Sequence, residues 1–342
     1  MNKILFLAHT EENDELSRLT LESLTAAKKM SAELNIPLLV GIIGDNIEKT
    51  KIIASAAPEA IFTIQGEEFK YSRYSSDALA IETICKEVAP TYIVAPATSR
   101  FSRVLPGVAH RLSGEIDTFV SALSIDNNKL FITRWYYRQR MYATLTRTKT
   151  PWIMTIAPGN FEKFEGSEQD FSFTNLTPTS TDTLMQTKIE GFVSPNCGKQ
   201  TLKPEAELLF VAGAGWSKKQ SDGNTKLAKA AELILDFLNK TDASLGGSKS
   251  VVDMSSEGEE ALSFMTHLNQ VGQTGATPSH KKGLSTCCHG EEPHAVGWRF
   301  INERRAVNLD PNCGWAQGKA DVLYVADAFA VIEKVNKILS YK

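Results

Sequence analysis

The chain has 342 residues, of which 42% are hydrophobic and 23% are charged, and its formal net charge is -3. This length favours about two domains, and the apolar fraction excludes a wholly disordered chain. The near balance of 37 basic and 40 acidic residues excludes a generally basic nucleic-acid binder. No apolar run approaches the ~18 residues of a membrane helix, so we expect no membrane insertion.

The cysteine content and the N-terminus favour a cytoplasmic protein. Five cysteines in a chain this long do not indicate a secreted disulfide framework, so a reducing compartment is expected. The apolar stretch within residues 1–9 is too short for a signal peptide. We interpret it as the first strand.

The first half alternates short apolar runs with amphipathic segments. Residues 37–43 form a continuous apolar run, which is typical of a strand buried on both faces of a parallel sheet. From periodicity, strands are expected at 4–8, 37–43, 60–64 and 91–95, and helices at 15–34, 46–57 and 76–88. This alternation with short connections indicates right-handed βαβ units.

After about residue 115 the pattern changes to strands without intervening helices. These strands are expected at 118–125, 130–134, 141–146 and 152–157, extending the sheet as antiparallel partners. Residues 162–186 are rich in Ser, Thr, Asp and Glu, and we interpret them as the connection out of the first domain. A further extended segment is expected at 189–204.

A second α/β unit begins near residue 206. Strands are expected at 207–212, 284–288, 306–309 and 322–325, and helices at 224–238 and 328–339. The turn Gly213-Ala214-Gly215 follows the first of these strands, where glycines let the backbone approach a phosphate. Because Lys218 replaces the third glycine of Rossmann spacing, an ordinary tight turn is an equally good interpretation.

Short motifs in a fixed order occupy the second half. They are Gly247-Ser248-Lys249-Ser250-Val251-Val252-Asp253, Gln270-Val271-Gly272-Gln273-Thr274-Gly275, the segment 287–297, the segment 306–311, Ala320-Asp321 and Ala326-Asp327. The first half carries Pro96-Ala97-Thr98, Val104-Leu105-Pro106, Thr133-Arg134 and Tyr137. In these motifs the chain resembles the alpha subunit of the electron-transfer flavoproteins, over nearly its whole length apart from about 162–205.

The resemblance implies a particular domain organisation. Residues 1–190 would form an adenine-nucleotide-hydrolase-like α/β domain that docks a beta subunit. Residues 206–327 would form a Rossmann-like FAD-binding domain with a parallel sheet, followed by a C-terminal helix at 328–342.

The resemblance also implies an electron carrier rather than an enzyme with its own substrate, so no catalytic residue is expected. As a heterodimer with a beta subunit, the chain would take electrons from a partner flavin dehydrogenase and pass them to a further acceptor. An acyl-CoA dehydrogenase of fatty acid oxidation is one such donor.

The FAD-binding residues implied by the resemblance lie within the motifs. Thr274 is similar to the residue whose hydroxyl reaches flavin N5, and His294 to the histidine that contacts the flavin C2 carbonyl. Taken alone, His294 would be an ordinary surface or helix-cap histidine. The full expected set is Ser248, Lys249, Val271, Gly272, Gln273, Thr274, His289, Gly290, His294, Asn308 and Asp327.

Departures from the family pattern concern charge. Lys249 stands where the family has an arginine over the flavin ring, which keeps the charge but loses the planar fork. Ala214 replaces a second arginine, and Glu291 and Glu292 are added beside an expected helix start. Fewer cations and more carboxylates disfavour negative charge on a flavin. We therefore predict a lower reduction potential, or weaker binding, than in a member with both arginines.

Residues 134–140 form a basic and aromatic stretch between two expected strands. Without a global basic excess, a solvated sheet edge or a partner interface is favoured over nucleic-acid binding. Arg138 and Arg140 are candidates to supply the charge missing at Ala214.

Cys287 and Cys288 are expected to be buried strand cysteines. Redox-active thiols, or a metal site with His280, His289, His294 and Cys313, are alternatives, but no C-x-x-C or H-x-x-x-H pair is present. No metal is therefore expected.

Two other functions stay open. One is a component of an electron-bifurcating, NADH-linked flavoprotein complex. The other is a nucleotide-binding or structural paralogue without FAD, which the changes at Ala214, Cys287, His289 and Glu291 leave open.

Overall fold

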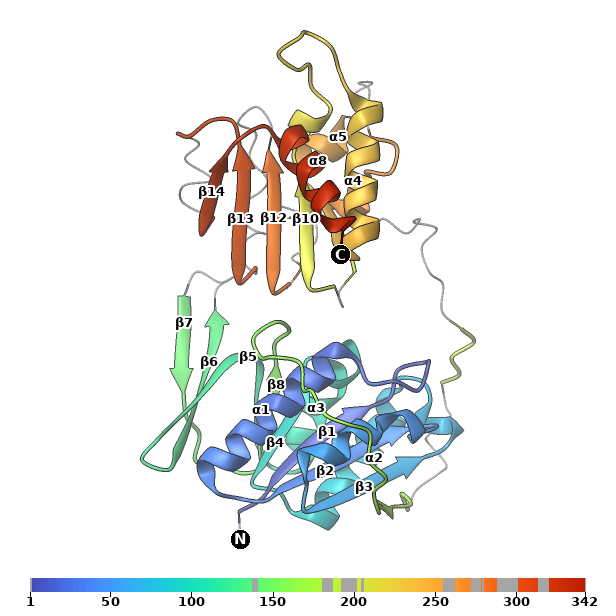
Figure 1. Cartoon of the computed structure of the whole chain (residues 1–342). Coiled ribbons are helices and arrows are strands. Elements are labelled where there is room, and N and C mark those ends of the chain that lie inside the picture. Colours follow the sequence, from blue (N-terminus) through green and yellow to red (C-terminus); the bar gives the residue numbers. More distant parts are fainter. Residues whose placement is uncertain are drawn as a thin grey trace. The chain divides into compact units, whose positions relative to one another are not determined.

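The computed structural model describes residues 2–136, 141–179, 187–191, 202–203, 206–254, 262–271, 278, 280–287, 301–312 and 320–341. The chain divides into two compact units, Met1–Phe192 and Val193–Lys342. Each unit has its own sheet flanked by helices (Figure 1). These observations confirm the expected α/β class with two units. No helix within the described ranges is long and apolar enough to cross a membrane.

The first unit is built on a nine-stranded sheet with the order β7-β6-β5-β8-β4-β1-β2-β3-β9. The strands are β1 (Ile4–His9), β2 (Leu38–Gly44), β3 (Ala60–Gln65), β4 (Tyr92–Pro96), β5 (Glu115–Asp126), β6 (Lys129–Tyr136), β7 (Met141–Leu145), β8 (Trp152–Ile156) and β9 (Thr174–Asn175). The helices are α1 (Arg18–Leu34), α2 (Tyr74–Val88) and α3 (Ser99–Arg111), with 3-10 turns η1 (Glu48–Ala56) and η2 (Glu67–Phe69).

Helices cover both faces of this sheet, which explains its continuous apolar strands. In β1, Phe6 packs into the cluster that contains the apolar side chains of α1. Its neighbours Leu5 and Leu7 point the other way, into the cluster formed with α2 and α3. All six residues of β1 are buried. A strand covered on both faces has no solvent-facing position, so it shows no alternation of apolar and polar residues.

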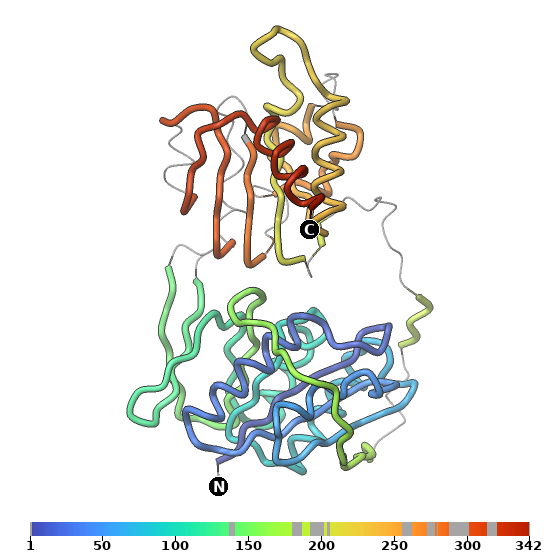
Figure 2. The backbone as a smooth tube through the Cα atoms, in the orientation of Figure 1, coloured from blue at the N-terminus to red at the C-terminus, as the bar shows by residue number. Residues whose placement is uncertain are grey.

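The antiparallel extension expected after residue 115 is right for part of this region and wrong for β8. Strand β6 pairs antiparallel with both β5 and β7, and Figure 2 traces this β6–β7 hairpin in green. Strand β8, however, lies between β5 and β4 and is parallel to both. The segment containing the hairpin acts as the crossover that parallel neighbours require. No helix was needed for that connection.

The second unit contains five parallel strands with the order β11-β10-β12-β13-β14. They are β10 (Leu208–Ala212), β11 (Ser244–Gly247), β12 (Lys282–Cys287), β13 (Glu303–Asn308) and β14 (Val322–Val325). The helices are α4 (Leu227–Thr241), α5 (Lys249–Asp253) and α8 (Ala328–Leu339), with 3-10 turns η3 (Ala214–Trp216) and η4 (His267–Asn269).

Helices α4 and α8 pack side by side on one face of this second sheet (Figure 1). Phe210 of β10 points into the cluster that they form, whereas Leu209 and Val211 point into a separate cluster with Val271 and Ile301. Strand β10 is therefore buried on both sides, as its apolar run predicts.

Candidate cofactor-binding site

The second sheet reverses its strand order at β10. The chain passes from β10 to β11 on one side, and then to β12 on the other side. In open parallel sheets, ligands bind outside the carboxyl ends of the strands at such a crossover. The turn Gly213-Ala214-Gly215 lies at this position.

The expected site residues fall into two groups. The described group lies at the carboxyl ends of strands in the second sheet, either at a strand's last residue, just after it, or hydrogen-bonded beside it. Its members are Ser248, Lys249, Val271, Asn308 and Asp327. Those outside the described residues are Gly272, Gln273, Thr274, His289, Gly290 and His294, together with Arg138, Arg140, Cys288, Glu291, Glu292 and Cys313.

Two of the motif segments lie side by side at the end of β11. The Val271 amide donates to the Gly247 carbonyl at 3.0 Å, which joins the two segments. The Ser248 amide donates to the carbonyl of Ala212, at the end of β10, at 2.9 Å. Buried Ser248 also caps α5, because its hydroxyl oxygen accepts from the Val251 amide at 3.3 Å. These hydrogen bonds fix the backbone of both segments against the crossover.

Asn308 ends β13 and is 1% exposed. Its side-chain oxygen accepts from the Asp310 amide at 3.0 Å, while its amide nitrogen has no hydrogen-bond partner among the described residues. A buried donor left without an acceptor costs about 1–3 kcal/mol. A polar ligand atom at this edge would remove that cost, so Asn308 fits a polar cofactor.

Asp327 follows β14 and begins α8. One carboxylate oxygen accepts from the Ala330 amide at 2.9 Å, which caps the helix. The half-buried side chain therefore holds the start of α8 at the same edge as Asn308. The Ala326 amide, which donates to the Asn308 carbonyl at 3.1 Å, joins the ends of β13 and β14.

The turn after β10 contains a residue that sequence reasoning missed. Trp216 is fully buried, and its indole N–H donates to the Thr286 hydroxyl at 2.8 Å. The Thr286 hydroxyl donates in turn to the Val211 carbonyl at 3.0 Å, and the Trp216 ring packs on Phe329 of α8 at 4.5 Å between centroids. The only sequence signal was an aromatic residue directly after a glycine turn. Trp216 thus ties the ends of β10 and β12 to α8.

No cation comes from the position of Ala214. This side chain is 1% exposed and packs in the hydrophobic cluster beneath α4 and α8. Lys249 is nearer the edge, but its ammonium is ion-paired with Asp253 at 3.6 Å. Neither of these two positions therefore gives this edge an uncompensated positive charge.

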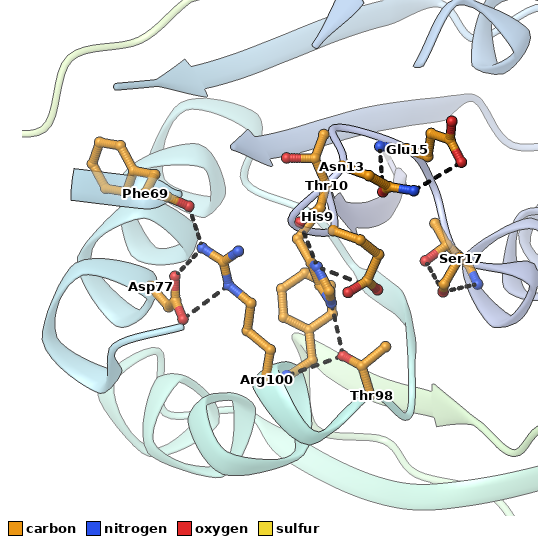
Figure 3. A network of polar contacts seen from close by, with 12 residues as sticks. His9, Thr10, Asn13, Glu15, Ser17, Phe69, Asp77, Thr98 and Arg100 are labelled. Atoms are coloured by element: carbon orange, nitrogen blue, oxygen red, sulfur yellow. Dashed lines mark hydrogen bonds and ion pairs between the residues drawn. The ribbon is translucent and has the colours of Figure 1, made fainter. Parts of the chain in front are cut away.

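The first sheet also has a crossover, between β1 and β4, and this one is filled by side chains. His9, at the end of β1, contacts the Thr10 carbonyl at 3.2 Å and the Thr98 hydroxyl at 2.9 Å (Figure 3). Arg100 donates two hydrogen bonds to Asp77, at 2.6 and 3.1 Å, and one to the Phe69 carbonyl (Figure 3). Because these groups satisfy one another, the second sheet is the better candidate for a ligand.

Two further observations concern cysteines and metals. Cys85 on α2 is a buried free cysteine, and burial raises the pKa of its thiol to about 12. Cys287 is the last residue of β12. Within the part of the chain that the structure describes, no group of three or more His, Cys, Asp or Glu side chains could hold a metal ion.

A parallel α/β sheet with a crossover and polar groups at its carboxyl edge places this unit among the doubly wound α/β folds, whose ligands bind at that edge. The model of the electron transfer flavoprotein domain matches residues 4–178 of this chain, just over half of its length. The chain therefore belongs to the electron transfer flavoprotein family, which confirms the resemblance seen in the sequence.

Relatives extend the similarity into the second unit. The electron transfer flavoprotein subunit alpha of Thermoanaerobacterium thermosaccharolyticum is 23% identical over 344 residues, covering 98% of each chain. The same subunit of Clostridium acetobutylicum is 25% identical over 336 residues, covering 96% of this chain and 92% of its own. Protein FixB of Clostridium saccharobutylicum is 21% identical over 335 residues, covering 96% of this chain and 92% of its own.

Proposed function

We propose that this chain is an electron-transfer flavoprotein alpha subunit that binds FAD at the carboxyl edge of its second sheet. With a beta subunit it would carry electrons from a partner flavin dehydrogenase to a further acceptor. Family membership supports the class of function. The observation that carries the cofactor assignment is Asn308, whose buried amide nitrogen has no acceptor among the described residues at the edge where the motifs gather.

The described residues have distinct roles in this proposal. Asn308 offers a hydrogen-bond donor, and Ser248 and Asp327 hold the starts of α5 and α8 at the edge. Trp216, buried against Phe329 and hydrogen-bonded to Thr286, fixes the turn after β10. Bound FAD would supply the redox centre. The chain itself needs no acid, base or nucleophile, because it binds, orients and shields the cofactor.

Charge at this edge supports the prediction of a low reduction potential. Ala214 contributes no cation, and the charge of Lys249 is shared with Asp253. Reduction adds negative charge to a flavin, which nearby positive charge stabilises. A spectroelectrochemical titration should therefore give a lower potential than in a family member with arginine at both positions. A higher potential would contradict this expectation.

The absorption spectrum of the purified protein tests the proposal. The full chain, co-expressed with the beta subunit from the same organism, should purify with the absorption bands of oxidised flavin. A correctly assembled but colourless heterodimer that takes up no added FAD would overturn the proposal and favour the paralogue without FAD.

Asn308→Ala should weaken FAD binding, since it removes the donor left available at the edge. The dissociation constant of FAD for this variant, measured by flavin fluorescence, should rise about 5- to 10-fold, as expected for the loss of one hydrogen bond of about 1 kcal/mol. Asn336→Ala is a matched control, because Asn336 is also buried but donates to the Leu233 carbonyl on the α4 side. This control should lose stability and keep its FAD affinity.

The electron donor is identified by reduction assays on the coloured heterodimer. Reduction by an acyl-CoA dehydrogenase with its substrate would support a role in fatty acid oxidation. Reduction by NADH alone would instead assign the protein to a bifurcating, NADH-linked complex.

A further inference from the structure

Asp253, the last residue of α5, lies between a lysine and a histidine near the carboxyl edge. Its carboxylate lies 3.6 Å from the Lys249 ammonium, one helical turn earlier, and 3.7 Å from Nδ1 of His267 on η4. The Asp253 side chain is 21% exposed, against 47% for Lys249. The carboxylate is thus the more enclosed partner, positioned from both sides.

This cluster adjoins the candidate cofactor site. Lys249 directly follows Ser248, whose amide is hydrogen-bonded to the end of β10. His267 begins η4, the turn that leads through Gln270 to Val271, and the Val271 amide is bonded to Gly247. Asp253 therefore contacts both segments that meet at the end of β11.

The position of a counter-charge decides how strongly Lys249 acts on a ligand at this edge. An isolated ammonium near a flavin favours the reduced form, because reduction adds negative charge. A carboxylate within 4 Å forms a dipole with the ammonium, and the field of a dipole falls off faster than the field of a single charge. Neutralising the carboxylate would expose the whole charge of Lys249.

The ion pair itself contributes little to folding. Partly exposed pairs four residues apart on a helix add only a small amount to stability.

We propose that Asp253 is a positioning residue that sets the reduction potential of the bound cofactor through Lys249. This inference rests on the proposed function, because it requires FAD at the carboxyl edge of the second sheet. It goes beyond that function by assigning the control of the potential to a carboxylate that need not touch the cofactor.

The test is the isosteric substitution Asp253→Asn in the full chain, co-purified with its beta subunit and saturated with FAD. The flavin potential should shift to a more positive value, with unchanged flavin content and little change in melting temperature. Lys249→Gln should shift the potential in the opposite direction. In the Lys249→Gln background, Asp253→Asn should then have a much smaller effect, since its action passes through the ammonium.

Asp236→Asn is a matched control. Asp236 forms the same kind of pair with Lys240, at 2.6 Å, on α4. That helix runs from the carboxyl edge back to the start of β11, so its last turn lies at the opposite edge of the sheet. The control changes the net charge equally and should leave the potential unchanged.

The outcomes separate this inference from the function on which it rests. A heterodimer that binds no FAD would overturn both. A flavin-bearing protein in which Asp253→Asn shifts the potential no more than Asp236→Asn would overturn only the role of Asp253. An equal shift with and without Lys249 would also overturn it, because the effect would then not pass through that lysine.

Discussion

His9 has its ring enclosed at the end of β1, with a hydrogen-bonding partner at each nitrogen. The Thr10 carbonyl can only accept, so Nδ1 carries the proton and Nε2 accepts from the Thr98 hydroxyl. Burial, with the positive charge of Arg100, lowers the pKa of His9 from its ordinary 6.5 to about 4. The folded protein therefore holds this side chain neutral.

This neutral histidine makes the fold sensitive to mild acid. At a pH between the pKa of His9 in the unfolded chain, 6.5, and its pKa in the folded chain, about 4, His9 is protonated only in the unfolded chain. Stability should therefore fall as the pH drops from about 6.5 to about 4, by about 3 kcal/mol in all. Above the unfolded pKa the effect is absent.

Urea unfolding at about pH 7.5 and about pH 5 measures this loss. His9→Gln should flatten the dependence, whereas substitution of exposed His110 should not. An unchanged dependence in His9→Gln would contradict the assignment.

The Arg100–Asp77 pair joins α3 to α2 out of contact with solvent. Asp77 is fully buried, Arg100 is 5% exposed, and two hydrogen bonds connect them. Asp77→Ala would leave the guanidinium buried without its carboxylate, which typically costs about 3–5 kcal/mol. Chemical denaturation should show this loss in full.

The double variant Asp77→Leu with Arg100→Met serves as the control. Because it removes both charges and keeps apolar volume, it should lose less stability than Asp77→Ala. If the double variant were the less stable of the two, the burial penalty would not be the dominant energy at this pair.

Among the elements, the turn after β10 depends most on a single side chain. Trp216→Phe would remove the indole donor to Thr286 and leave space next to Phe329. One lost hydrogen bond and a small cavity together should cost about 2–3 kcal/mol. Thr286→Ser keeps the hydroxyl and its two hydrogen bonds and removes only a methyl group, so it should cost less. Melting curves of both variants check the order, and equal losses would argue against a role for the ring.

Patterning predicted the elements best where burial alone determines them. The last helix was expected at 328–339 and is observed as Ala328–Leu339, because its apolar stripe is regular. Helix α3 was missed, since Pro106 lies within it and proline is a strong signal against a helix interior. Strand β11 was also missed, because two of its four residues are glycines that pack against other elements.

The order of the motifs predicted which segments form the candidate site, but not the side-chain contacts within it. The motifs indicated which segments gather at the carboxyl edge, because parallel strands end on one side. They did not indicate that Asp253 pairs with Lys249, or that Trp216 joins the turn after β10 to Thr286 and Phe329. Those contacts depend on side-chain directions that the fold fixes only after the chain is packed.

At the scale of the whole molecule, the two units have separate cores. Every hydrophobic cluster that the described residues form belongs to one unit. Two clusters draw on residues between 4 and 176, and the other two on residues between 202 and 339. Strand pairing follows the same division. Within the described part of the chain, the hydrophobic clusters and strand pairs of the first sheet are therefore formed by the first unit itself.

A fragment of residues 1–192 should consequently fold on its own. Its length is well above the about 40 residues below which a core needs extra support. It should unfold cooperatively and show the same loss of stability in mild acid as the full chain, because His9, Thr98 and Arg100 all lie within it. Circular dichroism during urea unfolding, at the two pH values used for His9, measures both properties. A fragment without a cooperative transition would mean that the first core needs the second unit, and a fragment insensitive to acid would remove His9 as the cause.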